Sequence, residues 1–394
     1  MPKPFHKRPI LLACLIISIG QLSMGLIFPA LPGIAHDFNV SLDEAQLLVA
    51  IYLLGFGPSQ FIYGPISDAL GRKKVLLTGL LLALAGLCLV IASKESLYGM
   101  VAGRFIQGLG TGCCAVLARA STRDSYSGEQ LPTALSYLAM VASITPMFAP
   151  VIGGLINHHL GWPMVFVTLL SYVALAWCAI SMLFKETMTK RSRVPNPKKI
   201  VSQYGQLLRS RYFVSFASIS WLNFSLVVTL ISVMPFIMQN QIGMTSDEYA
   251  LWAIIPALGM FLGTALTSRL RPMIGIKKML LCTPMLHALA AIWLCLAPLE
   301  PLAMMFGQLI MVIGNGIALP CSQAMVMQPF QHQAGAAAAL AGGGQMIISS
   351  FVSMALVQLG ISQSWHLGLV IGVFACITLT NILRGFNAPK PEFS

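Results

Sequence analysis

One arginine lies inside a long apolar stretch, in the segment "AGRFIQGLGTGCC" that runs from residue 102 to residue 114. Arg104 is followed by Gln107 and by glycines at positions 108, 110 and 112. A guanidinium stays charged and costs about 3 kcal/mol at the centre of a membrane helix, so its five N–H donors need acceptors. The glycines allow a neighbouring helix to come close enough to supply those acceptors.

Two interpretations of Arg104 stay open. It either clamps two helices permanently, or it has a functional role: it changes partners between two states of the protein, or its positive field lowers the pKa of a group or substrate that comes near. The candidate acceptors are Gln21, the backbone carbonyls of residues 20–25, and water. Because no Asp or Glu lies deep in an apolar stretch, Arg104 is the only formal charge expected at depth.

The composition predicts that lipid surrounds most of the chain. Of its 394 residues, 57% are hydrophobic and only 9% are charged, whereas soluble domains carry about 25% charged residues. Stretches of about 20 apolar residues are long enough to cross a membrane as helices, and the short alternating segments of a β-barrel are missing. Twelve such stretches predict an all-α polytopic membrane protein: residues 10–30, 45–66, 75–93, 97–119, 131–156, 162–184, 212–239, 249–269, 279–297, 300–323, 335–359 and 365–384.

The charged residues predict the orientation of these spans. Lys and Arg gather in alternate connections, while the intervening connections carry acids and a single base, Lys94. By the positive-inside rule, both termini are expected in the cytoplasm. The net charge of +12 is therefore an orientation signal and predicts no nucleic-acid partner.

The basic segment 185–211 divides the chain into two sets of six spans. It predicts an N-terminal bundle over residues 1–184, a cytoplasmic linker over 185–211 and a C-terminal bundle over 212–394; a lipid-binding or regulatory linker is the alternative. A weak internal repeat supports the division. The segment "GRKK" at residues 71–74 returns as "GIKK" at 275–278, and Trp162 and Trp365 are separated by nearly the same number of residues.

The sequence offers no signal for catalysis or for a bound cofactor. None of the nine cysteines stands in CxxC spacing, and nothing near the adjacent His158 and His159 completes a site. A phosphate-binding loop of the GxxxxGK[ST] type is also missing. We therefore expect neither an enzyme, nor a metal site, nor a nucleotide-driven pump.

Charged residues at helix ends are candidates for gating. In "GPISDALGRKK", Gly64 and Gly71 allow a tight turn, and Asp68 can accept from Arg72 or from a helix N-terminus, as a latch that holds one state. Arg123 and Asp124 follow in "ASTRDSYSG", either as a solvated ion pair or as a second latch.

A third pattern, "APVIGG", holds a proline and two glycines inside an apolar stretch. Pro150 removes a backbone hydrogen bond, and Gly153 and Gly154 thin the helix face, so neighbouring helices can pack closely or bend there. Ordinary membrane packing is the alternative interpretation.

Together with "FPALPGIAHDF" at residues 28–38, these patterns resemble the major facilitator superfamily over the whole chain. The phrases "PALP" and "ARASTRDSYSG" resemble its Bcr/CflA-type drug:proton antiporters, an EmrD-like group. The resemblance implies two six-helix bundles in a bacterial inner membrane that export lipophilic small-molecule drugs. It implies a proton gradient as the energy source, no bound cofactor and a monomer in the lipid bilayer.

The sequence departs from this family where a coupling acid is expected. In the first span Gly25 stands where relatives often have Asp, and the seventh span carries Asn223 but no acid. His287 titrates in a useful range but lies in a span that is usually peripheral. A cavity without an acid should favour neutral or weakly charged compounds, and the proton carrier is left unassigned.

The resemblance also implies which spans line the substrate cavity. Polar, aromatic and methionine side chains in the middle of those spans are the candidate contacts, because soft side chains adapt to many shapes: Gln21, Met24, Phe28, Tyr52, Phe56, Gln60, Gln107, Met140, Met147, Asn223, Trp252, Asn315 and Gln345. A transporter of a sugar or amino-acid derivative is the alternative function, and a membrane protein without transport activity is the second.

Overall fold

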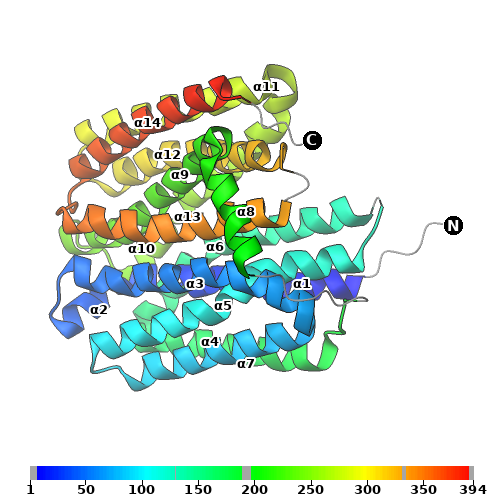
Figure 1. Cartoon of the computed structure of the whole chain (residues 1–394). Coiled ribbons are helices and arrows are strands. Elements are labelled where there is room, and N and C mark those ends of the chain that lie inside the picture. The colour runs from blue at the N-terminus through cyan, green and yellow to red at the C-terminus, as the bar shows by residue number, and fades with distance from the viewer. Residues whose placement is uncertain (1–6, 129, 189–196, 331–333, 390–394) are drawn as a thin grey trace. The chain divides into compact units, whose positions relative to one another are not determined.

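The computed structural model describes residues 7–128, 130–188, 197–330 and 334–389. All of their regular elements are helices, as Figure 1 shows. Eleven continuous helical segments in this described part are long and apolar enough to cross a membrane. The longest segment, Ser246–Leu296, contains α11 (Ile254–Leu296). This helix is two helices joined at Gly275, where φ is 80°, so its halves correspond to the eighth and ninth predicted spans.

The chain falls into two compact units, which are described separately. Unit 1 comprises residues Met1–Ala30 and Leu47–Pro195, and unit 2 comprises Leu31–Gln46 and Asn196–Ser394. The predicted boundaries at residues 184, 185, 211 and 212 stay predictions.

Unit 1 consists of long helices that pack along one another. The bounds of its helices, with α3 continuing from unit 2, are α1 (Lys7–Gly25), η1 (Phe28–Ala30), α3 (Leu42–Leu70), α4 (Arg72–Ala92), α5 (Leu97–Ser125), α6 (Gln130–Leu160) and α7 (Trp162–Leu183). Glycines make the contact between α4 and α5 close. A Cβ on Gly86 would collide with the backbone of Gln107, and a Cβ on Gly110 with that of Ala83.

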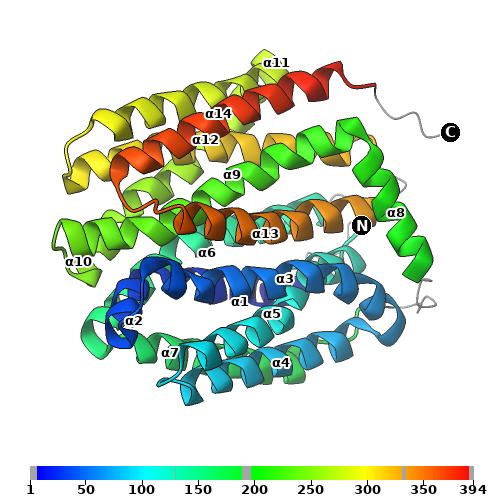
Figure 2. The same cartoon turned by 60° about the vertical axis from the view of Figure 1, so that its left-hand side comes forward.

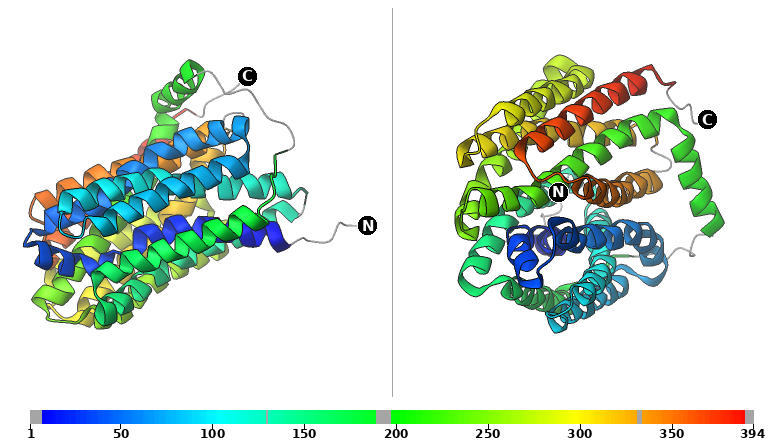
Figure 3. Two further views of the ribbon diagram at one scale, coloured as in Figure 1. Left: turned by 90° about the horizontal axis from the view of Figure 1, so that it is seen from below. Right: turned by 90° about the vertical axis from the view of Figure 1, so that its left-hand side faces the viewer.

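Unit 2 has the same architecture of long packed helices and adds several short helical elements. Its elements are α2 (Leu31–Phe38), α8 (Pro197–Arg209), α9 (Arg211–Phe236), the π-helical turn η2 (Ile237–Gln241), α10 (Ser246–Trp252), α11, α12 (Pro301–Met327), α13 (Ala334–Gln358) and α14 (Ser364–Asn387). A buried core of Leu, Ile and Met side chains joins α9, α11 and α12. Figures 2 and 3 show the short helix α8 crossing the ends of α9 and α13.

Two features of the fold were not predicted from the sequence. The segment from Pro197 to Arg209 is the helix α8, whereas the sequence predicted a plain linker. The first span also stops at Gly25 and continues as η1 and α2, because prolines at 29 and 32 cannot donate backbone hydrogen bonds within a continuous helix.

Candidate functional site

Arg104 lies at the centre of a buried polar site in unit 1. Its side chain is fully buried on α5. Nε donates to the carbonyl of Leu48 on α3 at 3.0 Å, and Nη1 donates to the carbonyl of Ser23 on α1 at 3.0 Å. Nη1 also donates to Oε1 of Gln107 at 2.8 Å. The guanidinium thus joins three helices through neutral acceptors.

An aromatic ring covers the same guanidinium. The Arg104 Cζ atom lies 4.3 Å from the centroid of the Tyr52 ring, which is a cation–π contact in a desolvated site. The Tyr52 hydroxyl donates to the carbonyl of Gly20 at 3.2 Å and shares a 2.9 Å hydrogen bond with Thr111. Phe56 stacks on Tyr52 with ring centroids 5.8 Å apart.

Some polar atoms of this site lack a hydrogen-bond partner. Nη2 of Arg104 and Nε2 of Gln107 are buried and unpartnered. Gln21, which the sequence offered as an acceptor, is not among the partners of Arg104. An unsatisfied buried donor raises the energy of this arrangement, so an added acceptor would be bound favourably.

Glycines bring α3 and α5 close enough to form the site. A Cβ on Gly108 would collide with the carbonyl oxygen of Tyr52, and a Cβ on Gly112 with Ser59. A Cβ on Gly55 would meet the carbonyl oxygen of Phe105. The three glycines after Arg104 therefore serve helix contact, which is the role the sequence indicated.

The basic end of unit 1 holds a network around Arg72. The turn between α3 and α4 contains Gly71, whose φ of 100° favours glycine. The buried Arg72 guanidinium forms ion pairs with Asp68 and, through Nε at 3.0 Å, with Asp124. Nη1 also donates to the Ser67 hydroxyl at 2.6 Å.

Glu186 completes this network from the segment after α7. Its carboxylate accepts from the backbone N–H of Arg72 at 2.9 Å and of Lys73 at 3.2 Å, at the positive N-terminus of α4. Partial burial raises the pKa of Glu186, but the backbone N–H groups of Met188, Arg72, Lys73 and Thr187 outweigh it and leave the pKa below its ordinary value. Sequence reasoning missed this residue, since it lies more than 110 positions from its partners.

The predicted pairing of Arg123 with Asp124 differs from the structure. Asp124 accepts from Arg72 and, at 3.2 Å, from the Thr187 hydroxyl. Arg123 is exposed and forms no ion pair within the described residues. Adjacent positions on a helix point in different directions, so Asp124 reaches across to α4 and Arg123 does not follow. Gly64, also predicted for this turn, lies beside Val116 of α5.

The "APVIGG" segment packs α6 against α1. A Cβ on Gly153 would collide with the carbonyl oxygen of Leu26, and a Cβ on Gly25 with the Ala149 side chain. Pro150 and Gly154 are buried in the same stretch. Gly25, where relatives often carry an acid, thus has no space for a larger side chain in this structure.

The predicted substrate contacts of unit 1 fall into two groups. Tyr52 and Gln107 contact Arg104, and Phe56 stacks on Tyr52. The remaining residues are apart from it in the described contacts: Phe28 and Gln60 are buried, Gln21 and Met24 are half-buried, and Met140 is exposed. The side chain of Met147 lies outside the described residues.

In unit 2 the predicted contacts lie on different helix faces. Gln345 of α13 accepts from Ser220 of α9 at 2.8 Å, next to a 3.1 Å hydrogen bond between Ser225 and Ser349. Asn223 instead donates to Thr378 of α14 at 3.4 Å, on another side of α9. Asn315 donates within α12 to the Met311 sulfur at 2.7 Å, and Trp252 is half-buried.

Carboxylates lie only near helix ends or in connections within the described residues. The imidazole of His287 in α11 is fully buried against Gly314 of α12. Among the described residues, the depth of unit 1 therefore contains one cation, Arg104, without a neighbouring acid. Sequence reasoning found this cation because its charge is exceptional in an apolar stretch.

Comparison with known proteins gives one consistent result. The model of the Major Facilitator Superfamily matches residues 13–354. Multidrug resistance protein MdtL of Salmonella heidelberg (strain SL476) is 27% identical over 97% of this chain and 95% of its own. Multidrug resistance protein D of Escherichia coli (strain K12) is 27% identical over 94% of each chain.

The solved structures agree on the fold. The crystal structure of a D-xylose-proton symporter superposes with a TM-score of 0.77 over 98% of this chain and 99% of that one, at 15% identity. With its apolar helices and bacterial relatives, the protein is a multi-pass inner-membrane transporter and not an enzyme. The family match over most of its length shows that the chain belongs to the Major Facilitator Superfamily.

Proposed function

We propose that the protein exports lipophilic small molecules in exchange for protons, by alternating between two states. The names of its relatives, multidrug resistance proteins, support drugs as the substrate class. The observation that carries the proposal is Arg104, a buried cation that retains one unpartnered nitrogen.

Arg104 is suited to exchanging its hydrogen-bond acceptors during a transport cycle. Its acceptors are two backbone carbonyls and one amide oxygen, none of which carries a charge. A neutral acceptor can be exchanged for another, or for a substrate oxygen, without separating an ion pair. In the proposed cycle, the positive field of Arg104 disfavours a proton or cation nearby and so promotes its release.

The network at the basic end of unit 1 is the proposed gate. Arg72 binds both Asp68 and Asp124, while Glu186 binds the N-terminus of α4. These contacts hold α3, α4, α5 and the end of α7 together at one surface. We propose that they stabilise one state of the transport cycle and are rearranged in the other.

The charge at depth also predicts substrate preference. Because the described spans offer a cation and no carboxylate at depth, neutral and weakly acidic lipophilic compounds should be exported better than dications. Everted membrane vesicles with an acid interior test the proposal: adding a transported compound should release protons, and Arg104→Ala vesicles should release none beyond background. Proton release by no compound, or equal release in the variant, would reject proton exchange through this site.

A further inference from the structure

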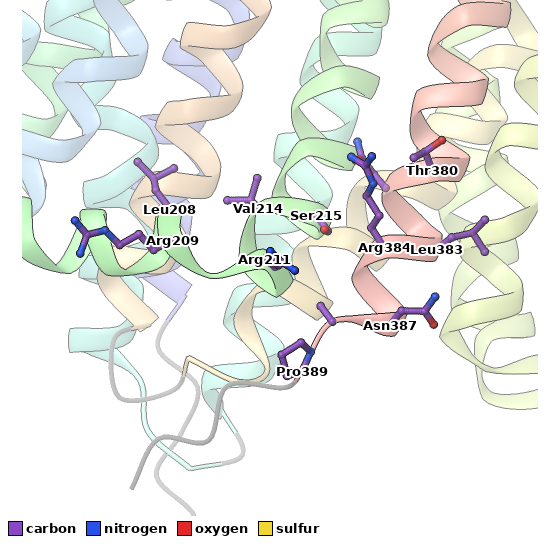
Figure 4. A pocket seen from close by; sticks show the side chains of 12 residues that line it. Leu208, Arg209, Arg211, Val214, Ser215, Thr380, Leu383, Arg384, Asn387 and Pro389 are labelled. Carbon is purple, nitrogen blue, oxygen red and sulfur yellow. The ribbon is translucent and has the colours of Figure 1, made fainter.

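A cavity lies at the basic end of unit 2, away from the residues of the proposed transport function. It has a volume of about 700 Å³ and lies between the C-terminal end of α8, the start of α9 and the end of α14. Arg209, Arg211 and Arg384 line it together with Leu208, Val214 and Leu383. Figure 4 shows Arg211 on α9 and Arg384 on α14 at facing sides of the cavity.

The positive charge of this cavity is not neutralised by the described part of the unit. None of the three arginines forms an ion pair with a described residue. Between residues 197 and 389 the only acids are Asp247, Glu248 and Glu300. These lie at the opposite ends of the helices, after α9 and before α12, so the cavity attracts an anion.

One face of α14 leads from the membrane span into this cavity. Leu369, Val373 and Ile377 follow one another at intervals of four residues, and their exposed fractions are 56%, 57% and 39%. Residues at this spacing share one helix face, and that face continues to Thr380 and Arg384, which line the cavity. An exposed apolar stripe thus ends at a cluster of guanidinium groups.

The helix α8 places the cavity at the membrane surface. Within α8, Leu207 is buried, whereas the neighbouring Leu208 is half exposed. Helices with an apolar side and a basic side lie in the headgroup layer of a membrane. Figure 2 shows α8 lying across the end of α9, as a helix in the plane of such a layer would.

We propose that this cavity binds the phosphate group of an anionic phospholipid. Arg211 and Arg384 contact the phosphate, Arg209 lies at the rim, and an acyl chain follows the stripe of α14. Guanidinium groups suit phosphate because they donate two parallel hydrogen bonds. A free phosphate offers the same headgroup chemistry but leaves the stripe uncovered, which favours the lipid. The positive-inside rule predicts that the lipid comes from the cytoplasmic leaflet.

The test measures retained lipid and does not depend on drug transport. The purified full chain in detergent is titrated with phosphatidylglycerol, and bound lipid is counted by native mass spectrometry. Phosphatidylethanolamine, a zwitterion whose ammonium offsets its phosphate, is the comparison without net charge. Arg211→Gln with Arg384→Gln should weaken retention of phosphatidylglycerol about tenfold or more. The control pair Arg269→Gln with Lys278→Gln removes the same charge from exposed positions at the same end and should change retention less than twofold.

The outcomes separate the possible sources of the phosphate. If the double variant is poorly folded by size-exclusion chromatography, Arg384→Gln alone, at an exposed position, should still weaken retention about threefold. Equal weakening in the control pair, or equal retention of phosphatidylethanolamine, would overturn the proposal. Complete displacement of the lipid by inorganic phosphate would show a site for free phosphate and would also overturn it.

Discussion

Residues 103–112 of unit 1 and residues 307–316 of unit 2 stand at the same place in the two halves of the chain. Their sequences are "GRFIQGLGTG" and "GQLIMVIGNG", and their separation equals that of Gly71 and Gly275. Both segments use glycine for close packing: Gly110 lies against Ala83 of α4, and Gly314 lies against His287 of α11. Helix packing is therefore duplicated between the units.

The charge is not duplicated. The position of Arg104 is occupied in unit 2 by Gln308, which is also buried, at 3% exposure. Because unit 2 builds the same helix pair around an uncharged amide, a cation is not needed to form this fold. The difference favours a functional role for Arg104 over a structural clamp.

The largest expected effect comes from making unit 1 like unit 2. Arg104→Gln keeps polar hydrogen-bonding groups but removes the charge and the contact with the Tyr52 ring. We expect drug efflux to fall about tenfold or more while the amount of folded protein in the membrane changes little. Drug accumulation in everted vesicles, normalised to folded protein, measures this loss of transport. The matched control Gln308→Met should keep efflux within about twofold; an equal loss in both variants would remove the distinction between the units.

The reverse substitution should damage the fold. Gln308→Arg buries a cation inside α12, where Gln308 is 3% exposed and no described carboxylate forms a contact with it. The expected cost is about 3 kcal/mol, so the yield of monodisperse protein in size-exclusion chromatography should drop severalfold. A normal yield would show that unit 2 can supply acceptors as unit 1 does.

The turns "GRKK" and "GIKK" extend the comparison to the basic ends. Both begin with a glycine at positive φ, 100° at Gly71 and 80° at Gly275. Among the described residues, only the turn "GRKK" forms ion pairs with acidic side chains, since Arg72 binds Asp68 and Asp124. Asp68→Asn should slow efflux by roughly fivefold with unchanged insertion, because it weakens one state of the gate. Normal turnover in this variant would contradict the assigned gate.

The smallest effect is expected at Glu186. Its pKa is lowered in the folded protein, so the stabilisation is present above its ordinary value of 4.5 and is lost as the pH falls below that value. Glu186→Gln should lower the free energy of unfolding at pH 7 by about 0.5 kcal/mol, a small amount because the carboxylate meets solvent. Thermal unfolding in detergent should therefore differ between variant and parent at pH 7, and the difference should shrink as the pH falls below 4.5. A constant difference would mean that the contact acts without the charge.

The sequence predicted the spans well because lipid imposes a strict length and composition on them. It also located the turn at Gly275, where the structure joins the two halves of α11, and it selected Arg104 as a buried charge. These predictions depend on local sequence, and local sequence was sufficient.

The acceptors of Arg104 depend on packing between distant helices. The carbonyl of Leu48 comes from 56 residues away, and Glu186 reaches Arg72 across 114 residues. Every residue has a backbone carbonyl, so residue types do not show which carbonyl accepts a hydrogen bond from Arg104. Leu48 therefore could not be found from the sequence. Helix α8 was missed because its basic residues and prolines indicated a linker, while its apolar side becomes evident only where Leu207 is buried.

The most direct test of the central claim replaces Arg104 with lysine. Arg104→Lys keeps the charge but removes the planar group that contacts Leu48, Ser23 and Gln107 at once. In proteoliposomes with an imposed proton gradient, we expect drug exchange to fall about tenfold, with a melting temperature close to that of the parent. Normal exchange in this variant would contradict the account, because a fixed positive charge alone would then be sufficient.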